Sequence, residues 1–300
     1  MSSESLTPAL RHRPGVLTLA VPPSERAPPL VVEVPRSGRQ YPNEFQVACT
    51  FTTLHAYVSM YVEEIYGRAP EHGVPLLWAN FPNSWIDLNR SLEDLDPALL
   101  AEPWPTPLEP GDKSLRLGTG LIHKWGKDDL PIYDRKLTVA EVMHRIDRYY
   151  RPYHDLLGEL IQANMQEFGA SWHISCHCMA TVGPRWSHDK GQPRKDFCVS
   201  DLHGQTCDAE FMTVCKEAFE AEGFSCSVND PFVGGESIRR HSDPKGRRNS
   251  IQFEMIKGLY MDEDTWARTE RFDSVRDGVG RVIGRIAAYC RDAARRSSTS

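Results

Sequence analysis

The 300-residue sequence lacks the features that would place it in a membrane or on a nucleic acid. It has no apolar run of about 18 residues, the length that a membrane-spanning helix requires. It also lacks a basic excess, because 35 Lys and Arg against 41 Asp and Glu leave a net charge of -6. A general nucleic-acid binder needs a basic face. We therefore expect neither nucleic acid nor membrane as a partner.

A secretory signal peptide, with its charged and then apolar pattern, is also missing from the amino end. We therefore expect a cytoplasmic location and eight reduced cysteines. Residues 1–29 are rich in Pro, Ser and Arg, and we expect them to form a tail or a loose edge segment. Residues 30–294 are expected to form one domain, and residues 295–300 a disordered end.

Between these ends, strand-like and helix-like segments alternate. Short apolar or β-branched runs predict strands over 30–34, 74–81, 170–179, 224–228 and 250–256, with another beginning near residue 196. Helical spacing of apolar residues predicts helices over 57–66, 138–150, 153–168, 208–222 and 272–294. This alternation predicts an α/β fold with a mainly parallel sheet flanked by helices. Because helix 272–294 could serve as core or as an interface, a homo-oligomer stays open.

A lone carboxylate, Glu254, stands in the apolar run 251–256. Burying it as an ion is expensive, so it either faces water or sits in a cleft where its charge has a partner. Upstream, a turn-rich loop ends in Gly234 and Gly235. Paired glycines let the backbone approach a ligand closely, or they simply form a tight turn.

Three polar residues, Asp87, Asn89 and Arg90, end a short apolar run. Arg90 can grip a substrate carboxylate through two parallel hydrogen bonds, and Asn89 can add a donor. The alternative, which is favoured for this motif taken alone, is a surface salt bridge between Asp87 and Arg90.

The run from His173 to Cys178 is dense in metal-ligating side chains. On a strand, Ser175 and His177 would share one face, and Cys176 and Cys178 the other. A zinc site needs three or four converging ligands, so further ligands would have to come from elsewhere. The alternative is a core strand with small thiols and one hydrogen-bonded histidine.

Asp201 and His203 follow a strand-like run and precede a helix start. They could line a cleft, or they could close the turn and cap the helix.

Taken in order, these blocks resemble the N-formylglutamate amidohydrolase family over roughly residues 30–265. The blocks are Pro35 to Gly38, Asp87 to Arg90, Gly120 to Ile122, Tyr150 to His154, Cys176 to Met179, Ser200-Asp201, the double-glycine loop, and Gln252-Phe253-Glu254. The resemblance implies a zinc-carboxypeptidase-like fold in a single domain and hydrolysis of a C–N bond in a small acidic substrate. We expect the substrate contacts to come from Asn89, Arg90, Asp87, Ser37, His154, Asp201, Gly234 and Gly235.

The departures from the family fall on its metal-ligand positions. Arg36 stands where the family has His, Ser175 where it has Asp, and Cys178 where it has Ser. Near the position of Ser59 the family usually has an acidic residue, which the resemblance implies is a metal ligand. Among the metal ligands that the resemblance implies, only His177 remains in its place. A guanidinium stays protonated and has no lone pair for a cation.

Two mechanisms therefore compete. In one, a divalent metal such as zinc activates water and Glu254 is the general base. That scheme needs replacement ligands, to be drawn from Cys176, Cys178, His173, His55 and Glu63. In the other, which we favour, no metal or other cofactor is bound. Arg36 then stabilises the developing oxyanion, and Glu254 or His177 moves the proton. Cys178 could attack as a thiolate if Arg36 lowers its pKa.

The sequence thus predicts an amidohydrolase acting on an amide, cyclic amide or imide bond of a small carboxylate-bearing substrate. One alternative is a binding protein that kept the pocket and lost catalysis. Another is a lyase, racemase or ring-opening enzyme that depends on Cys178.

Overall fold

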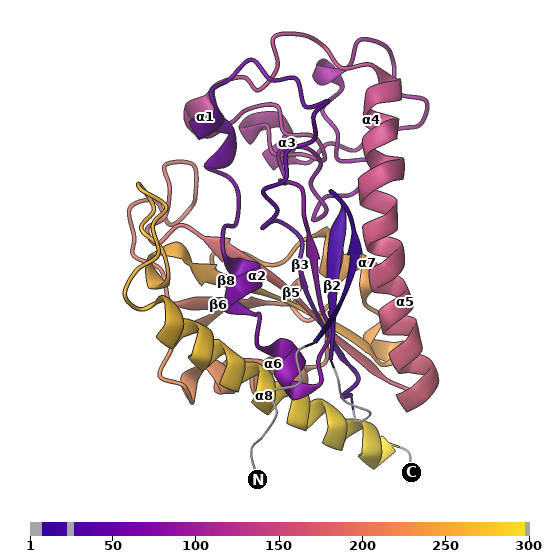
Figure 1. Ribbon diagram of the computed structural model, residues 1–300, viewed down its shortest axis with the longest axis vertical. Coiled ribbons are helices and arrows are strands. Elements are labelled where there is room, and N and C mark those ends of the chain that lie inside the picture. The colour runs from indigo at the N-terminus through magenta and orange to yellow at the C-terminus, as the bar shows by residue number, and fades with distance from the viewer. Residues whose placement is uncertain (1–7, 23–26, 298–300) are drawn as a thin grey trace.

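A mixed sheet of eight strands organises the computed structural model, which describes residues 8–22 and 27–297 (Figure 1). Its strand order is β1-β2-β4-β3-β5-β8-β6-β7. The strands are β1 (Ala9–Arg13), β2 (Leu17–Val21), β3 (Leu30–Val34), β4 (Leu76–Ala79), β5 (Ser171–Met179), β6 (Phe197–Ser200), β7 (Cys226–Val228) and β8 (Arg248–Ile256). The central strands β4, β3, β5 and β8 run parallel, whereas β2 and β6 join this group antiparallel. The predicted α/β class with a mainly parallel sheet is confirmed.

The helices differ widely in length. They are α1 (Phe51–His55), α2 (Val62–Ile65), α3 (Asp112–Leu117), α4 (Val139–Arg145), α5 (Arg151–Phe168), α6 (Ala209–Glu220), α7 (Glu236–His241) and α8 (Phe272–Ser297). A π-helical turn at Ile146–Tyr150 joins α4 to α5, and short 3₁₀ turns lie at Ala69–His72, Pro97–Leu99, Lys127–Asp129, Pro244–Gly246 and Lys257–Leu259. Local sequence explains several ends. Thr138 and Glu141 form a capping box at α4, and Asp208 caps α6.

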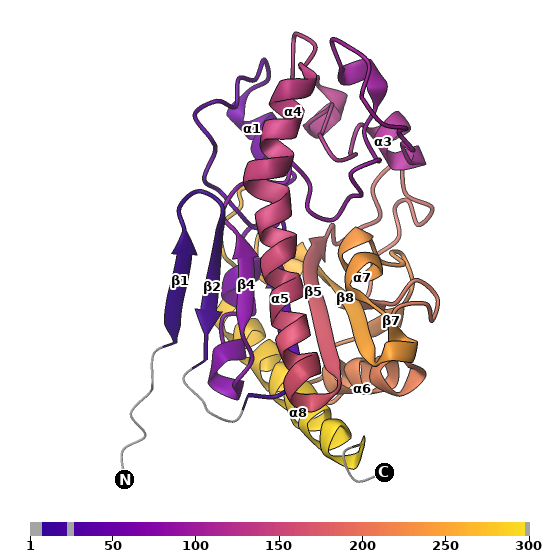
Figure 2. The same ribbon diagram turned by 90° about the vertical axis from the view of Figure 1, so that its right-hand side faces the viewer.

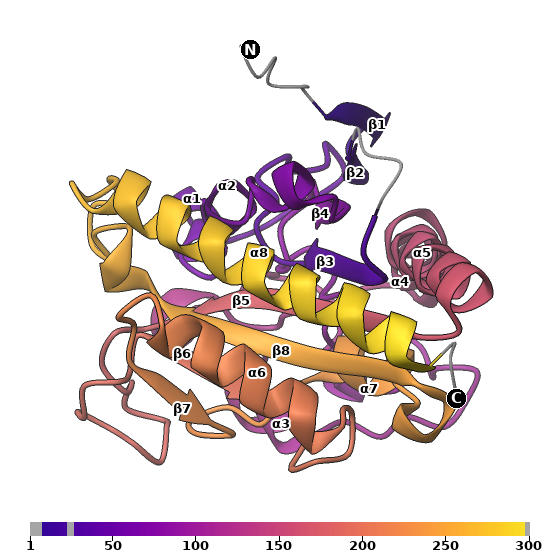
Figure 3. The same cartoon turned by 90° about the horizontal axis from the view of Figure 1, so that it is seen from below.

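The helices cover the sheet on both faces. Figure 2 shows α5 and α7 in front of the strands, while α8 crosses behind them. In Figure 3, α8 runs along the underside of the sheet beside α6. Val279, Val282 and Ile283 of α8 are fully buried, so the apolar side of this helix forms core. Among the described helices, none combines the length and apolar character needed to cross a bilayer.

The N-terminal segment differs from its predicted tail. Residues 9–21 form a hairpin of β1 and β2, and β2 pairs antiparallel with β4. Leu17 and Leu19 of β2 are buried, whereas β1 is exposed along its length. The Pro, Ser and Arg residues around it make the overall composition of residues 1–29 typical of a tail, so this five-residue apolar strand was not predicted. Residues 1–7, 23–26 and 298–300 lie outside the described part, and α8 extends to Ser297, past the predicted end at 294.

The helix predicted over 57–66 is also shorter than expected. Only Val62–Ile65 is helical, because Tyr61 has a left-handed backbone with φ of 67° and interrupts the helical path. The short helices α1 and α7 were not predicted. Neither is long enough to show a helical period in the sequence.

The hairpin gives a stability test. Leu19→Ala should lower the free energy of unfolding by about 2–4 kcal/mol, because it leaves a cavity against β4. Leu10→Ala, in exposed β1, is the matched control and should change it little, since Leu10 is 63% exposed and Leu19 only 2%. Urea denaturation of both variants measures the difference. Equal effects would contradict the burial of β2.

Candidate active site

A cavity of about 330 Å³ lies where the parallel strands β3, β5 and β8 end. In an open α/β sheet, ligands bind beyond the carboxyl ends of the strands. Five cationic residues line this cavity, against three carboxylates. The cations are Arg36, Arg90, Lys113, Arg194 and Lys257, and the carboxylates are Asp87, Asp129 and Glu254. This balance suits an anionic ligand.

Glu254 is the carboxyl group of the cavity best suited to move a proton. It lies on β8, is buried, and accepts a hydrogen bond from Gln252 Nε2 at 2.9 Å. Burial raises the pKa of Glu254 to about 7, although the positive charges of Arg36 and Lys113 act in the opposite direction. A carboxyl group with a pKa near the working pH both accepts and returns a proton readily. Glu254, the one carboxylate in the apolar run 251–256, therefore lies in a cleft with charged neighbours.

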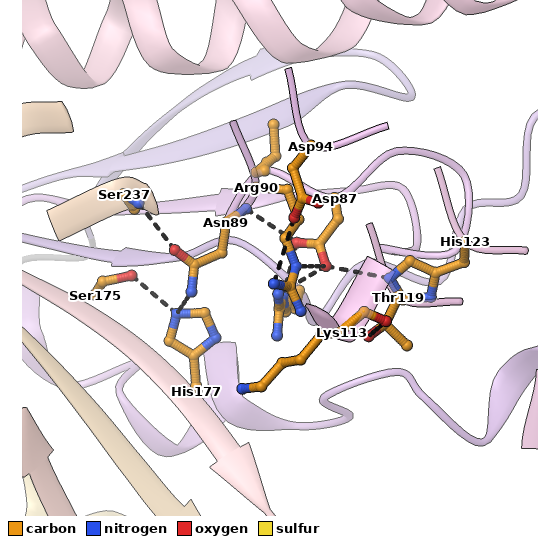
Figure 4. A network of polar contacts seen from close by, with 12 residues as sticks. Asp87, Asn89, Arg90, Asp94, Lys113, Thr119, His123, Ser175, His177 and Ser237 are labelled. Carbon is orange, nitrogen blue, oxygen red and sulfur yellow. Dashed lines mark hydrogen bonds and ion pairs between the residues drawn. The ribbon is translucent and has the colours of Figure 1, made fainter. Parts of the chain in front are cut away.

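Asp87 organises a second group of polar residues that line the cavity (Figure 4). Arg36 binds it through two bonds, from Nε to Oδ1 at 2.8 Å and from Nη2 to Oδ2 at 2.7 Å. His123 Nε2 lies 3.2 Å from Oδ2, and the backbone N–H of Asn89 donates to Oδ1. Burial alone would raise the pKa of Asp87, but the charge of Arg36 and the His123 hydrogen bond lower it. Asp87 is thus an ionised anchor for Arg36.

The predicted ion pair between Asp87 and Arg90 is long, with Arg90 Nε 4.0 Å from Oδ2. Arg90 Nη1 lies 3.5 Å from Asp94, and its buried Nε has no hydrogen-bond partner among the described residues. Arg90 lines the cavity, so its guanidinium has donors to spare for a ligand. Its predicted grip on a substrate carboxylate stays a prediction.

Lys113, on α3, lies close to this guanidinium. It is an exposed residue, yet its Nζ lies 5.2 Å from the centre of the Phe232 ring on the cavity wall. Desolvation and the positive charges of Arg90 and Arg36 lower the pKa of Lys113. Cations that repel one another would be relieved by a bound anion. The sequence offered no signal for Lys113, because it lies in the Pro- and Gly-rich stretch 96–117.

Asn89 uses its amide group within the protein. Oδ1 accepts from the Ser237 N–H at 2.9 Å, and Nδ2 donates to Gln252 Oε1 at 3.0 Å. Gly235 is needed here, because a Cβ on it would lie 2.5 Å from Asn89 Nδ2. Gly234 has φ of +119°, which also favours glycine. Both glycines line the cavity, but the close contact of Gly235 is with Asn89 and that of Gly234 is with Ile238.

His177 lies beside the cavity, paired in register with Glu254 on the neighbouring strand. Burial and then the positive charge of Arg36 lower the pKa of His177 to about 3, so the imidazole is neutral. Ser175 Oγ contacts its Nε2 at 3.0 Å, which agrees with their predicted shared face. Its buried Nδ1 has no partner among the described residues.

The two neighbouring cysteines are poor nucleophiles in this environment. Cys178 lines the cavity, but burial raises the pKa of its thiol, which argues against the predicted activation by Arg36. Burial also raises the pKa of Cys176, which is fully enclosed in the core. Both are therefore thiols near neutral pH.

Three predicted substrate contacts lie outside the cavity wall: Ser37, His154 and Asp201. Asp201 Oδ1 accepts from the N–H of Gly204 and from Asn229 Nδ2, so this side chain closes the turn, as the alternative held. His154 Nε2 contacts the Leu88 carbonyl at 2.9 Å. Asp201 and His154 thus hold loop backbone in place, whereas the buried Ser37 hydroxyl has no hydrogen-bond partner among the described residues.

Other residues of the cavity wall were missed: Tyr57, Lys113, His123, Trp186, Arg194 and Phe232. His123 directly follows the Gly120 to Ile122 block of the resemblance, which could have drawn attention to it. The others stand in irregular segments without a periodic pattern.

The donor set does not fit a metal ion. Among the described residues, no group of three or more His, Cys, Asp and Glu converges in a way that could hold one. The replacement ligands considered above are engaged elsewhere: His55 Nδ1 contacts the Tyr41 hydroxyl at 2.8 Å, Glu63 pairs with Arg39, and His173 lies 3.4 Å from Glu33. His177 Nδ1 and His123 Nδ1 are both buried without a hydrogen-bond partner among the described residues and feel the charge of Arg36, but two nitrogens do not make a metal site. We derive no catalytic step through a metal.

Comparison with known proteins finds a family model, N-formylglutamate amidohydrolase, that matches residues 28–261. The N-formylglutamate deformylase of Pseudomonas aeruginosa is 25% identical over 240 residues, which cover 77% of this chain and 82% of the relative. That of Pseudomonas putida is 25% identical over 209 residues, covering 68% and 70%. The crystal structure of N-formylglutamate amidohydrolase from Ralstonia eutropha JMP134 has a TM-score of 0.87 at 40% identity, covering 93% of this chain and 99% of that one.

The raised pKa of Glu254 predicts a pH-dependent stability. The folded-state pKa of about 7 lies above the ordinary 4.5, so the folded protein binds a proton that the unfolded chain releases. The contribution to stability is complete below pH 4.5 and is lost as the pH rises through 7. Glu254→Gln should therefore raise the free energy of unfolding at pH 8 by roughly 3 kcal/mol at most, and with it Tm, and leave both nearly unchanged at pH 4.5.

Thermal unfolding of both proteins at the two pH values measures this difference. Ser250→Ala, on the same strand, is the control: the Ser250 hydroxyl contacts His173 and not Glu254, so this change should not raise Tm at pH 8. A Tm of Glu254→Gln below that of the wild type at pH 8 would contradict a raised pKa of Glu254 in the folded protein.

Proposed function

The chain belongs to the N-formylglutamate amidohydrolase family, and we propose that this amidohydrolase cleaves the amide bond of small N-acyl amino acids. The observation that carries this proposal is Glu254, a buried carboxyl group with a pKa of about 7 in a cavity rich in cations. The names of the relatives make N-formylglutamate the first substrate to assay.

The substrate carboxylate would bind between Arg90 and Lys113. Arg90 forms only long ion pairs, with Asp94 at 3.5 Å and with Asp87 at 4.0 Å. Lys113 forms no ion pair among the described residues, and its Nζ lies over the Phe232 ring. A guanidinium recognises a carboxylate through parallel hydrogen bonds, and an ammonium adds a point charge. Binding there would leave the acyl carbonyl to be placed near Arg36 and Glu254 on the same cavity wall.

Catalysis would then use two groups. Glu254 takes a proton from water as that water attacks the carbonyl carbon, and it returns the proton to the leaving nitrogen as the C–N bond breaks. Arg36 stabilises the negative charge that develops on the carbonyl oxygen. Its Nε and Nη2 are held by Asp87, while its Nη1 has no partner among the described residues. A fixed cation of this kind needs no reorganisation during the reaction.

We further propose that the reaction proceeds without a metal. This rests on the chemistry of the donor set, because Arg36 offers no lone pair and the neutral His177 cannot form a site alone. Elemental analysis of purified protein should find well under one equivalent of zinc, and turnover should survive exhaustive chelation. A stoichiometric metal whose removal abolishes turnover would overturn this part of the proposal.

Substitutions separate the two roles. Glu254→Gln should lower kcat by about 10²-fold or more, because an amide cannot take the proton that the ionised carboxyl group accepts from water. Arg90→Ala and Lys113→Met should mainly raise KM, because they remove charge from the carboxylate site. Arg116→Met is the matched control for Lys113→Met, since Arg116 lies on the same helix and pairs with Asp112 outside the cavity. Unchanged turnover in Glu254→Gln and Arg90→Ala would defeat the assignment.

The pH profile gives an independent check. Glu254 acts as a base only when ionised, so kcat/KM should rise with pH through about 7 and then level off. The remaining activity of Glu254→Gln should lack this rise. A wild-type profile that is flat between pH 5 and 9 would rule out Glu254 as the base.

A further inference from the structure

A continuous chain of hydrogen bonds runs from Glu33, behind the cavity, to Glu254. Ser237 donates its hydroxyl to Glu33 Oε1, and its backbone N–H donates to Asn89 Oδ1 at 2.9 Å. Asn89 Nδ2 donates to Gln252 Oε1 at 3.0 Å, and Gln252 Nε2 donates to Glu254 Oε1 at 2.9 Å. We call these five residues the Glu33–Glu254 chain. Figure 4 shows the step from Ser237 to Asn89, whose Nδ2 also lies 3.3 Å from His177 Nε2.

The backbone N–H of Ser237 determines the direction of the hydrogen bonds that lead from it to Glu254. The Ser237 N–H can only donate, so Asn89 must present its amide oxygen to it and turn its NH₂ group toward Gln252. Gln252 must then present its oxygen to Asn89 and its NH₂ group to Glu254. Turning either amide over would bring two acceptors or two donors face to face.

Burial makes this arrangement firm. All five side chains are buried, so water cannot easily replace a lost partner. A buried donor or acceptor without a partner is expensive. The members come from β3, α7, the segment after β4, and β8, so the chain joins four separate parts of the fold.

The charged neighbours of Glu254 explain why its carboxyl group needs the Gln252 hydrogen bond to keep one orientation. Arg36, Lys113 and Arg194 all act on its charge, and a free carboxylate would turn toward them. Gln252 instead engages Oε1, while Oε2 has no hydrogen bond among the described residues and is not enclosed. One oxygen is thus held and the other remains available to a water molecule.

On the basis of the proposed function, we infer that Asn89 and Gln252 are positioning residues, which orient Glu254 for proton transfer through the Glu33–Glu254 chain. Amide groups do not ionise near neutral pH, so the chain orients the base and does not conduct protons. Asn89 then acts through Gln252, rather than by gripping the substrate carboxylate.

Two substitutions test the inference. Gln252→Met removes the donor to Glu254 at similar length. Asn89→Asp keeps an acceptor for Ser237 but offers no donor to Gln252, which would turn its NH₂ group to residue 89 and its oxygen to Glu254. Each variant should lower kcat at least tenfold and leave KM within about twofold. The double variant should lose no more than Gln252→Met alone, because both changes act through one hydrogen bond.

Ser250→Ala is the matched control. Ser250 is a buried serine two residues before Gln252, and its hydroxyl contacts His173 rather than the chain. Its kcat should equal that of the wild type. A raised KM in Asn89→Asp, with losses that multiply in the double variant, would show that Asn89 binds substrate and would overturn the inference.

Thermal unfolding of the wild type, the two single variants and the double variant separates this inference from the proposed function. The hydrogen bonds exist without substrate, so the Tm changes of the two single variants should be non-additive even if no N-acyl amino acid is turned over. Absence of turnover in the wild type would defeat the proposed function alone. Additive Tm changes would refute the chain, whatever the substrate is.

Discussion

The two-bond ion pair between Arg36 and Asp87 is the interaction on which the rest of the site depends. It joins the end of β3 to the segment that carries Asn89 and Arg90, and Asp87 also holds His123. Losing one partner of a buried pair leaves an uncompensated charge, which is strongly destabilising. The pair also keeps a permanent cation in the cavity wall, where its charge depresses the pKa of His177 and opposes the raised pKa of Glu254.

The site combines two opposing electrostatic effects. Several cations line the cavity and favour a bound anion, whereas burial makes the one basic carboxyl group, Glu254, reluctant to ionise. The result is a carboxyl group with a pKa of about 7, held by Gln252 beside a cationic wall. In the amidohydrolase family to which the chain belongs, such a group suits attack of water on an amide carbonyl. The packing of Gly235 on Asn89 shows how closely the backbone is fitted around this arrangement.

Much of the fold could be predicted because its central strands carry strong local patterns. The runs 30–34, 170–179 and 250–256 became β3, β5 and β8 with ends shifted by at most two residues. Glu254 could be singled out because it stands alone in an apolar run, and Arg90 because it belongs to a polar group that ends one. The β1–β2 hairpin, Lys113 and His123 could not, since short strands and loops have no period. The contacts of Asn89 with Ser237 and Gln252 join residues more than 140 positions apart, and no local pattern encodes them.

The central claim is that a protein cation supplies the positive charge at the reacting carbonyl. Its most direct test is the kcat of the double variant Arg36→Met/Asp87→Asn, which removes both members of the ion pair and so leaves no lone buried charge. The account predicts a folded protein that still binds N-acyl amino acids through Arg90 and Lys113, with kcat lower by about 10²-fold or more. A kcat close to that of the wild type would contradict it.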